Sequence, residues 1–215
     1  MKNLLSNINP QTIIEDEFIK NLLNFEDVFK EILSVCNNKF SFGTGSYLFD
    51  GTKYEYCDKM FQKQVLLYEK VKNINSVCEI GTYMGHSLLI MLISNPRLRI
   101  TSIDIDDTFS LPAIKLLEKK FNTNINFIKG SSLDVLPNLQ EKFDLFHIDG
   151  THKLDFVTKE FEMCKNLTSS DEINVIFDDY DTISEMKNLI LKKHTILEQV
   201  VPNCNWRNSY LKIKL

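Results

Sequence analysis

Hydrophobic and polar residues follow two alternating spacings along most of the chain. Short apolar runs, typical of buried strands, are separated by longer stretches in which apolar residues recur at helical spacing. The predicted strands are Ser76–Ile80, Arg99–Asp104, Ile125–Lys129, Phe143–Asp149 and Ile173–Asp178. The helical patterns cover Gly85–Ser94, Ala113–Phe121, Ser132–Leu139, Lys153–Leu167 and Ile183–Lys192. Strands that alternate with helices in this way predict an α/β fold, with a parallel sheet and helices on both of its faces.

Both ends of the chain extend this pattern. Apolar residues recur at helical spacing from Thr12 to Asn37, and Asp58–Val71 is a further predicted helix. The tail, residues 194–201 and 207–215, predicts two more strands that form an antiparallel hairpin at the sheet edge. We therefore expect a Rossmann-like, doubly wound, mostly parallel seven-stranded sheet. Residues 1–57 would form an N-terminal helical cap and lid loop, and residues 58–215 the main domain.

The composition and net charge of the chain argue against several kinds of binding partner. A chain of 215 residues that is 43% hydrophobic can bury one substantial α/β core, and its formal charge of -4 gives no global attraction to nucleic acid. The longest apolar run, "SLLIMLIS", is too short to cross a bilayer, and no signal-peptide core develops near residue 1. The cysteines are scattered without a C-x-x-C pair: Cys36, Cys57, Cys78, Cys164 and Cys204. We expect a cytoplasmic protein without a disulfide framework, a zinc site, a membrane anchor or a nucleic-acid partner.

Polar residues and glycines lie at or directly after the ends of the predicted strands. They are Glu79, Gly81, Asp104, Gly130, Ser132, Asp149, Asp178 and Asp179. In open parallel sheets, ligands bind beyond the carboxyl ends of the strands, near the point where the strand order reverses. The functional site is therefore expected along this rim.

The first strand and the helix after it predict a cofactor site. In "VCEIGTYMGHSLL", the glycines at 81 and 85 allow the backbone to approach a ligand, and Asp104 at the end of the next strand suits ribose hydroxyls. The stretch is not the G-x-G-x-x-G of dinucleotide folds, because residue 83 is a tyrosine. The spacing favours S-adenosylmethionine over NAD. The plainer alternatives are an ordinary strand-to-helix turn and, for Asp104, a helix cap.

The ends of the later predicted strands carry carboxylates that could hold a divalent cation. A divalent cation can stabilise a negative charge that develops on an oxygen atom, and hard cations such as Mg²⁺ prefer carboxylate oxygens. Asp149, Asp178 and Asp179 end adjacent predicted strands, where three like charges are costly without a cation. Neighbouring strand residues point to opposite faces, so Asp178 and Asp179 share an ion only if the chain bends there.

These motifs together resemble the class I S-adenosylmethionine-dependent O-methyltransferases over roughly Phe61 to Asp181. The matching pieces are E-x-G-x-x-x-G-x-S from Glu79, "TSIDID", "GSSLDVLPNL", "FDLFHIDGTH" and "IFDDYD". The resemblance implies that the loop from Glu79 to Gly85 wraps the methionine part of the cofactor, that Asp104 holds the ribose and that Ser131 and Ser132 lie against the adenine. The cofactor-binding set it implies is Glu79, Gly81, Tyr83, Gly85, Ser87, Asp104, Gly130, Ser131, Ser132 and Asp149.

The resemblance is sharper for the metal-dependent small-molecule branch, which includes the catechol, macrolide-sugar and aminocoumarin-sugar enzymes. It implies a cation held by Asp149, Asp178 and Asp179, and catalysis by Asp149 together with His152 as the base. The catechol branch has a lysine three residues beyond the first aspartate, where this chain has His152, followed by Lys153. Because an unperturbed histidine titrates near neutrality, His152 suits the role of base. Its plainer alternative is an exposed residue at a helix start.

The remaining histidines have structural interpretations. His147, inside a strand pattern, is predicted to be a satisfied core residue, and His86 follows Gly85 at a helix start. His194 is predicted to interact with the terminal carbonyls of a helix.

We therefore predict an enzyme: a cation-dependent O-methyltransferase acting on a hydroxyl of a sugar or similar small polyol, with a small-molecule or glycan acceptor as its partner. A catechol or phenol methyltransferase that uses Lys153 or a solvent base, and a non-catalytic cofactor-binding protein, are the alternatives. A NAD-dependent oxidoreductase fits the glycine pattern less well. The aromatic residues of the lid loop could line the acceptor pocket or simply pack on the core: Phe40, Phe42, Tyr47 and Phe49. The sequence leaves three points open: whether the cation is Mg²⁺, Mn²⁺ or Ca²⁺, whether His152 or Lys153 is the base, and whether the chain forms a homodimer.

Overall fold

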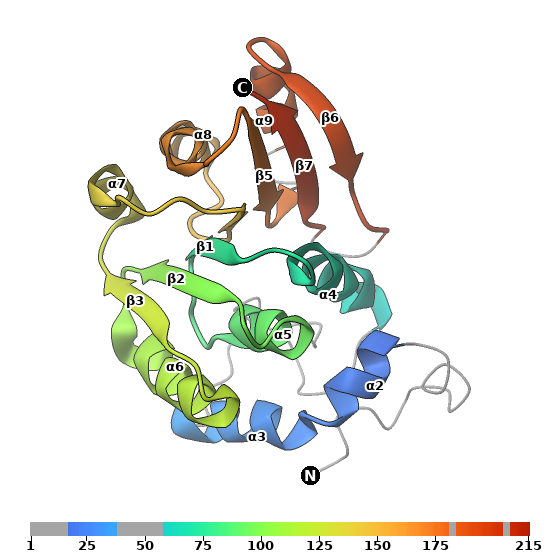
Figure 1. Cartoon of the computed structure of the whole chain (residues 1–215), viewed down its shortest axis with the longest axis vertical. Helices are drawn as coiled ribbons and strands as arrows, with labels where there is room; N and C mark the ends of the chain where they lie inside the picture. The colour runs from blue at the N-terminus through green and yellow to red at the C-terminus, as the bar shows by residue number, and fades with distance from the viewer. Residues whose placement is uncertain (1–16, 38–57, 181–183, 204–206) are drawn as a thin grey trace.

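The described residues form a seven-stranded sheet with the strand order β3-β2-β1-β4-β5-β7-β6 (Figure 1). The computed structural model describes residues 17–37, 58–180, 184–203 and 207–215. The strands are β1 (Ser76–Ile80), β2 (Arg99–Asp104), β3 (Ile125–Lys129), β4 (Leu145–Ile148), β5 (Glu172–Phe177), β6 (Thr195–Val200) and β7 (Ser209–Lys214). The first five pair in parallel, and β7 runs antiparallel between β5 and β6. The strand order reverses between β1 and β4.

Helices cover both faces of the sheet. They are α2 (Glu17–Leu23), α3 (Glu26–Val35), α4 (Asp58–Val71), α5 (His86–Ser94), α6 (Asp107–Phe121), α7 (Ser132–Val135), α8 (Leu154–Cys164) and α9 (Glu185–Leu191). Short 3₁₀ turns follow α7 and α8 at Leu136–Asn138 and Lys165–Leu167. In Figure 1, α4, α5 and α6 lie on one side of the sheet with α2 and α3 beneath them, and α7 and α8 lie on the other side.

Each face of the sheet has its own hydrophobic core. Because successive strand residues point to opposite faces, Val77 of β1 belongs to the core with α2 to α6, and Cys78 belongs to the core with α8 and α9. α5 carries the apolar run seen in the sequence, and its residues from His86 to Ile93 are buried. The site described below lies at the rim of the first face.

The structure confirms the predicted fold class and shifts several boundaries. β1, β2 and β3 have the predicted bounds. β4, at Leu145–Ile148, is shorter than the predicted Phe143–Asp149, and β5, at Glu172–Phe177, begins and ends one residue earlier than predicted. The helix predicted from Ala113 begins at Asp107, because the Asp106 side chain accepts a hydrogen bond from the Thr108 backbone N–H and caps it. The described part of the pattern predicted from Thr12 to Asn37, residues 17–37, contains two helices, since the chain turns at Asn24 and Phe25.

Two expectations concern residues outside the described part of the chain. Residues 38–57 include the aromatic lid loop, with Phe40, Phe42, Tyr47 and Phe49. The division into a cap of residues 1–57 and a domain of residues 58–215 stays a prediction.

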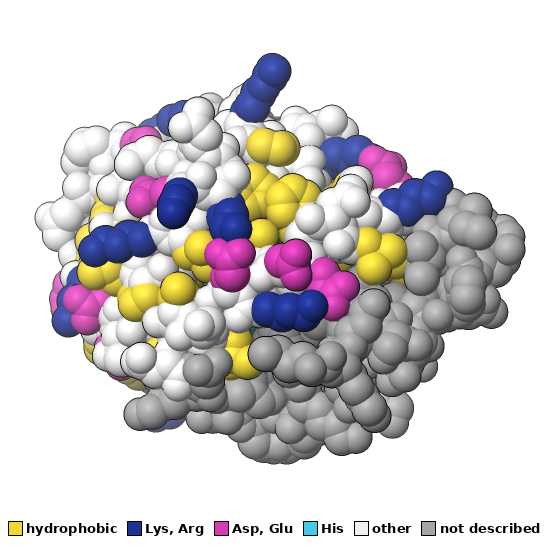
Figure 2. Space-filling model, turned by 90° about the horizontal axis from the view of Figure 1, so that it is seen from below, with side chains coloured by type: hydrophobic (Ala, Val, Ile, Leu, Met, Phe, Trp, Pro, Cys, Tyr) yellow, Lys and Arg dark blue, Asp and Glu magenta, His cyan; other side chains and the backbone are white. Residues whose placement is uncertain are grey.

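The described surface and helices bear on possible partners. No helix among the described residues is long and apolar enough to span a bilayer. On the face seen in Figure 2, acidic and basic side chains are interspersed with apolar ones, and the described part of that face carries no continuous basic surface.

Candidate active site

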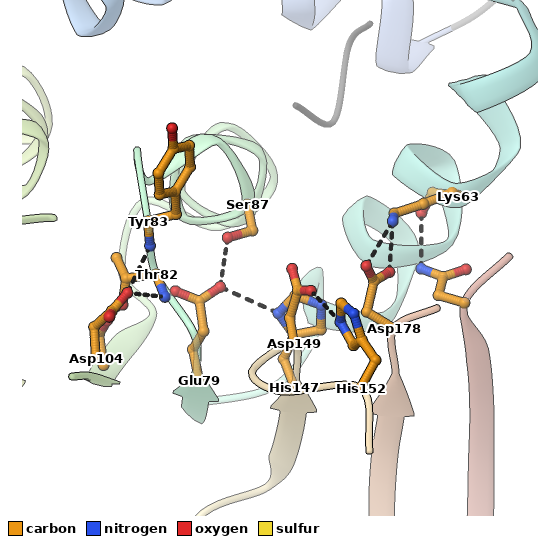
Figure 3. A network of polar contacts seen from close by, with 12 residues as sticks. Lys63, Glu79, Thr82, Tyr83, Ser87, Asp104, His147, Asp149, His152 and Asp178 are labelled. Carbon is orange, nitrogen blue, oxygen red and sulfur yellow. Dashed lines mark hydrogen bonds and ion pairs between the residues drawn. The ribbon is translucent and has the colours of Figure 1, made fainter. Parts of the chain in front are cut away.

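A row of polar side chains follows the carboxyl ends of β2, β1, β4 and β5 on one face of the sheet (Figure 3). The register pairs Glu79 with His147 across β1 and β4. Asp149 lies two residues after His147, and Asp178 two residues after Ile176, the partner of His147 in β5. Strand alternation therefore turns Glu79, His147, Asp149 and Asp178 to the same face.

Gly81 brings the loop after β1 against the loop after β4. It has a φ of 90°, and a Cβ built on it would lie 2.0 Å from the backbone oxygen of Asp149. No side chain fits at this position. The sequence predicted that Gly81 allows a close approach to a ligand, whereas the structure shows that the approaching group is the chain itself. Gly85 also has positive φ, at 70°, and a Cβ there would be 3.3 Å from the Ala113 Cβ.

Asp104 fixes the conformation of the predicted cofactor loop. Its Oδ2 accepts hydrogen bonds from the backbone N–H groups of Thr82 and Tyr83 at 2.9 and 2.8 Å, and its Oδ1 accepts one from Asp106. These contacts hold Tyr83 in a left-handed conformation, with a φ of 45°, and its ring packs edge-on against Phe109. Asp104 thus orders the loop to which the resemblance assigns the cofactor.

Glu79 is a fully buried carboxylate at the centre of the row. Its Oε1 accepts a hydrogen bond from the Ser87 hydroxyl at 2.5 Å and lies 3.1 Å from Nδ1 of His147. Its Oε2 is buried without a hydrogen-bond partner among the described residues. Because a buried, unpaired carboxylate oxygen is costly, this atom indicates a missing donor.

The predicted adenine-binding residues lie at the start of α7. Gly130 donates its backbone N–H to the Asp104 carbonyl at 2.8 Å, which places this turn beside the cofactor loop. The Ser132 hydroxyl donates to Glu160 of α8 at 2.5 Å, and Ser131 is the N-cap residue of α7 without a side-chain capping bond. The Ser132 hydroxyl is therefore engaged within the protein, and the Ser131 side chain makes no cap.

A compact group of possible metal ligands lies at the ends of β4 and β5. One ligand atom each from His147, Asp149 and Asp178 lies within 4.8 Å of the others. Burial, followed by the nearby charge of Asp178, raises the pKa of Asp149 to about 7. Burial acts to raise the pKa of Asp178 as well, but the charges of Lys63 and His147 outweigh it and lower that pKa.

His152 lies between two carboxylates. Its Nε2 is 3.2 Å from Oδ1 of Asp149, and its Nδ1 is 3.0 Å from Oδ2 of Asp179. Burial acts to lower the pKa of His152, but the hydrogen bonds to Asp149 and Asp179 outweigh it and raise the pKa to about 10. The side chain is 30% exposed, so the imidazole remains in reach of an acceptor. Lys153, the alternative base, is exposed at the N-cap of α8.

Asp179 stands apart from the group of possible ligands. The chain does bend there, as a shared ion would require, since Asp179 has a φ of 44°. The bend directs its carboxylate to His152, and the group of ligand atoms contains Asp149 and Asp178 but not Asp179. The structure thus brings two of the three predicted metal ligands together, and the third contacts the predicted base.

Two residues of the site were missed by the sequence interpretation. His147 is buried as predicted for a core histidine, yet it also contacts Glu79 and belongs to the group of possible ligands. Lys63 of α4 forms a buried ion pair with Asp178. The sequence does carry a signal for it, because Lys63, Leu67 and Val71 share one face of α4 and all three are buried. A lysine on a buried helix face requires a partner.

Residues 78–180, from β1 to the turn after β5, match a family model described as a methyltransferase domain. No curated protein matches the chain in sequence.

Several solved structures share the fold. An O-methyltransferase from Bacillus cereus in complex with SAH is 17% identical, with a TM-score of 0.62 over 88% of this chain and 91% of that one. The O-methyltransferase TomG from Streptomyces achromogenes, involved in tomaymycin synthesis and bound to SAM, is 17% identical, with a TM-score of 0.55 over 71% and 78%. The N-methyltransferase NodS from Bradyrhizobium japonicum is 13% identical, with a TM-score of 0.50 over 70% and 91%. At these identities the likeness shows the fold.

The chain has a Rossmann-like methyltransferase fold, and a methyltransferase-domain model matches residues 78–180 within it. Its rim of polar side chains lies at the switch point between β1 and β4, where this class of sheet binds ligands.

Proposed function

We propose that the chain is a divalent-cation-dependent O-methyltransferase that uses S-adenosylmethionine to methylate a hydroxyl of a sugar or similar small polyol. One observation carries the proposal. His152, whose imidazole has a carboxylate at each ring nitrogen, lies between Asp149 and Asp179, on the rim that also presents Asp178 and Glu79.

The residues after β1 fit the cofactor. S-adenosylmethionine carries an ammonium group on its methionine part, and the unpartnered Oε2 of Glu79 is a buried acceptor that such a donor would satisfy. The loop is already shaped for a ligand, because Asp104 fixes the backbone of Thr82 and Tyr83. We assign the methionine part to the loop from Glu79 to Gly85, with Tyr83 and Ser87, and the ribose to Asp104. The adenine is assigned to the turn with Gly130, Ser131 and Ser132.

Asp149 and Asp178 fit a divalent cation. Their ligand atoms lie within 4.8 Å of each other, and burial, followed by the nearby charge of Asp178, raises the pKa of Asp149, so a cation beside it would stabilise the ionised carboxylate. When bound, the cation would act as a Lewis acid on the acceptor oxygen. Oxygen ligands favour a hard cation, of which Mg²⁺ is our first choice.

His152 is proposed to receive the proton of the acceptor hydroxyl. With both ring nitrogens held by carboxylates and a pKa of about 10, the imidazole is protonated at neutral pH and accepts no proton. We assign the accepting role to Nε2, because its partner Asp149 is a proposed cation ligand whose charge would then be shared. Asp179 would keep Nδ1 protonated and fix the tautomer, a role that replaces the metal ligation first predicted for it.

The choice of oxygen as the acceptor atom rests on this site and not on the fold. Neighbours in structure include both O-methyltransferases and an N-methyltransferase. An alcohol needs a base and charge stabilisation at the reacting oxygen, and both are proposed on this rim. The catechol and phenol alternative retains Lys153 as a base, while a non-catalytic cofactor-binding protein would have no use for crowded carboxylates.

The proposal is tested by transfer of labelled methyl from S-adenosylmethionine to a panel of sugars, nucleotide sugars, glycans and phenols. Each acceptor is assayed with Mg²⁺ and with EDTA. We expect transfer to a polyol that EDTA abolishes and Mg²⁺ restores. Transfer that is insensitive to EDTA would remove the cation from the proposal, and transfer to phenols alone would favour the catechol alternative.

A further inference from the structure

Lys63 forms a buried ion pair with a proposed metal ligand. Its Nζ lies 2.6 Å from Oδ1 and 2.7 Å from Oδ2 of Asp178, and both side chains are 5% exposed. The ammonium thus contacts both oxygens of the carboxylate, as Figure 3 shows.

The fold fixes the position of this ammonium. Lys63 lies on the buried face of α4, and its backbone carbonyl accepts a hydrogen bond at 3.2 Å from the side chain of Asn208, a buried residue next to the start of β7. Both ends of the residue are therefore tied to the sheet, the backbone beside β7 and the ammonium at the end of β5. A lysine held in this way is part of the site and is shielded from solvent.

The pair places a positive charge where a divalent cation is proposed to bind. A divalent cation that binds Asp149 and Asp178 meets the Lys63 ammonium already paired with Asp178. Either both cations share the Asp178 carboxylate, or the ammonium is displaced from it. Two cations that share one buried carboxylate repel each other, and the repulsion is strong at this range in a poorly solvated site. Removal of one partner of a buried pair, in turn, leaves an uncompensated charge.

We infer that Lys63 is an internal counter-ion of Asp178, which balances this carboxylate in the cation-free protein and competes with the divalent cation for it. The inference rests on the proposed function for the location of the cation. Lys63 acts through Asp178 and is a positioning residue. Its presence would weaken cation affinity while keeping the site folded between turnovers.

The test compares Lys63→Met with Lys70→Met in the full chain. Lys70 lies two turns further along α4, and its ion pair with Glu198 is partly exposed, with the two side chains 22% and 46% exposed. Both substitutions remove one ammonium from the same helix. Mn²⁺ alone is the probe: its affinity is measured by electron paramagnetic resonance, and the thermal unfolding midpoint is measured with EDTA and with Mn²⁺.

We expect Lys63→Met to bind Mn²⁺ at least about tenfold more tightly than the wild type, the size of a modest change in close-range electrostatics. With EDTA its unfolding midpoint should be lower than that of Lys70→Met, and Mn²⁺ should restore most of the difference. Lys70→Met should match the wild type in Mn²⁺ affinity. Two results would overturn the inference. One is an Mn²⁺ affinity of Lys63→Met that equals or falls below that of the wild type, and the other is a lowered unfolding midpoint that Mn²⁺ does not restore.

Lys63→Arg keeps the inference testable if Lys63→Met does not fold in either buffer. The planar guanidinium binds both carboxylate oxygens firmly, so Mn²⁺ affinity should be lower than in the wild type, and unchanged affinity would contradict the inference. Failure of the proposed function looks different. If wild-type transfer resists EDTA while Lys63→Met gains Mn²⁺ affinity, the cation requirement is wrong and the counter-ion role stands.

Discussion

Asp149 is the residue on which the charges of the site converge. It contacts His152, its backbone oxygen lies against Gly81, and its partly exposed carboxylate lies close to the buried carboxylate of Asp178. Burial and the charge of Asp178 raise its pKa to about 7, from an ordinary value of 3.8. In the cation-free protein the ionised form of Asp149 is therefore disfavoured relative to the unfolded chain.

This shift predicts a stability that depends on pH. Between about pH 4 and pH 7 the folded state binds a proton at Asp149 that the unfolded state has lost, so stability falls as pH rises through that window. Asp149→Asn removes the ionisation. With EDTA at about pH 8, we expect it to be more stable than the wild type by at least about 1 kcal/mol, because one pKa unit corresponds to about 1.4 kcal/mol.

Urea unfolding at several pH values measures this difference, with Asp155→Asn as the control on an exposed aspartate of α8. The control should stay close to the wild type at each pH. Mg²⁺ should stabilise the wild type and leave Asp149→Asn unchanged. A wild type that is more stable than Asp149→Asn at about pH 8 without a cation would contradict the raised pKa of Asp149.

At the scale of elements, the strands carry most of what the sequence could predict. Their short apolar runs and polar ends placed Glu79, Asp104, Asp149 and Asp178 at one rim, and the structure agrees. The contacts that cross between elements were beyond the pattern. The direction of the bend at Asp179 does not follow from spacing along the chain. Spacing places Lys63 on a buried helix face but does not give Asp178 as its partner, because that contact depends on the packing of two distant segments.

At the amino ends of the strands, away from the proposed site, Asp144 joins β4 to β1, and its loss is predicted to affect stability without affecting cofactor binding. The Asp144 carboxylate accepts hydrogen bonds from the backbone N–H groups of Asn75 and Ser76 at 2.7 and 3.1 Å, which ties the start of β4 to the start of β1. Asp144→Ala leaves these donors without their acceptor. We expect a loss of about 1–2 kcal/mol in the free energy of unfolding, with unchanged affinity for S-adenosylmethionine at the opposite end of the strands.

Asp171→Ala is the comparison for this effect, because Asp171 is exposed and pairs with Lys214 at the surface. The loss in the free energy of unfolding of Asp171→Ala should stay below about 0.5 kcal/mol, as is usual for exposed ion pairs. Both free energies come from urea unfolding. Equal losses in the two variants would show that the Asp144 contacts do not hold the strands together.

At the scale of the whole molecule, the strand order brings the proposed cofactor site next to the proposed cation site. The proposed cofactor loop follows β1, the proposed cation and base follow β4 and β5, and the switch point between β1 and β4 makes them neighbours. The alternation of strands and helices predicted a parallel sheet with its site at the carboxyl ends of the strands. The strand order that makes β1 and β4 neighbours comes from the structure. The acceptor does not follow from it. The aromatic loop at residues 38–57, to which the acceptor wall was assigned, lies outside the described residues.

Methyl transfer by His152→Ala tests the central claim most directly, with Lys153→Ala as its neighbour in the chain. Both variants are assayed with labelled S-adenosylmethionine, Mg²⁺ and the acceptor that the wild type methylates best, and cofactor affinity is measured alongside. We predict that His152→Ala loses about 100-fold or more in turnover, the usual contribution of a general base, and that it retains cofactor affinity. Lys153→Ala should stay within about twofold of the wild type, since Lys153 is exposed. Wild-type turnover in His152→Ala would contradict the account.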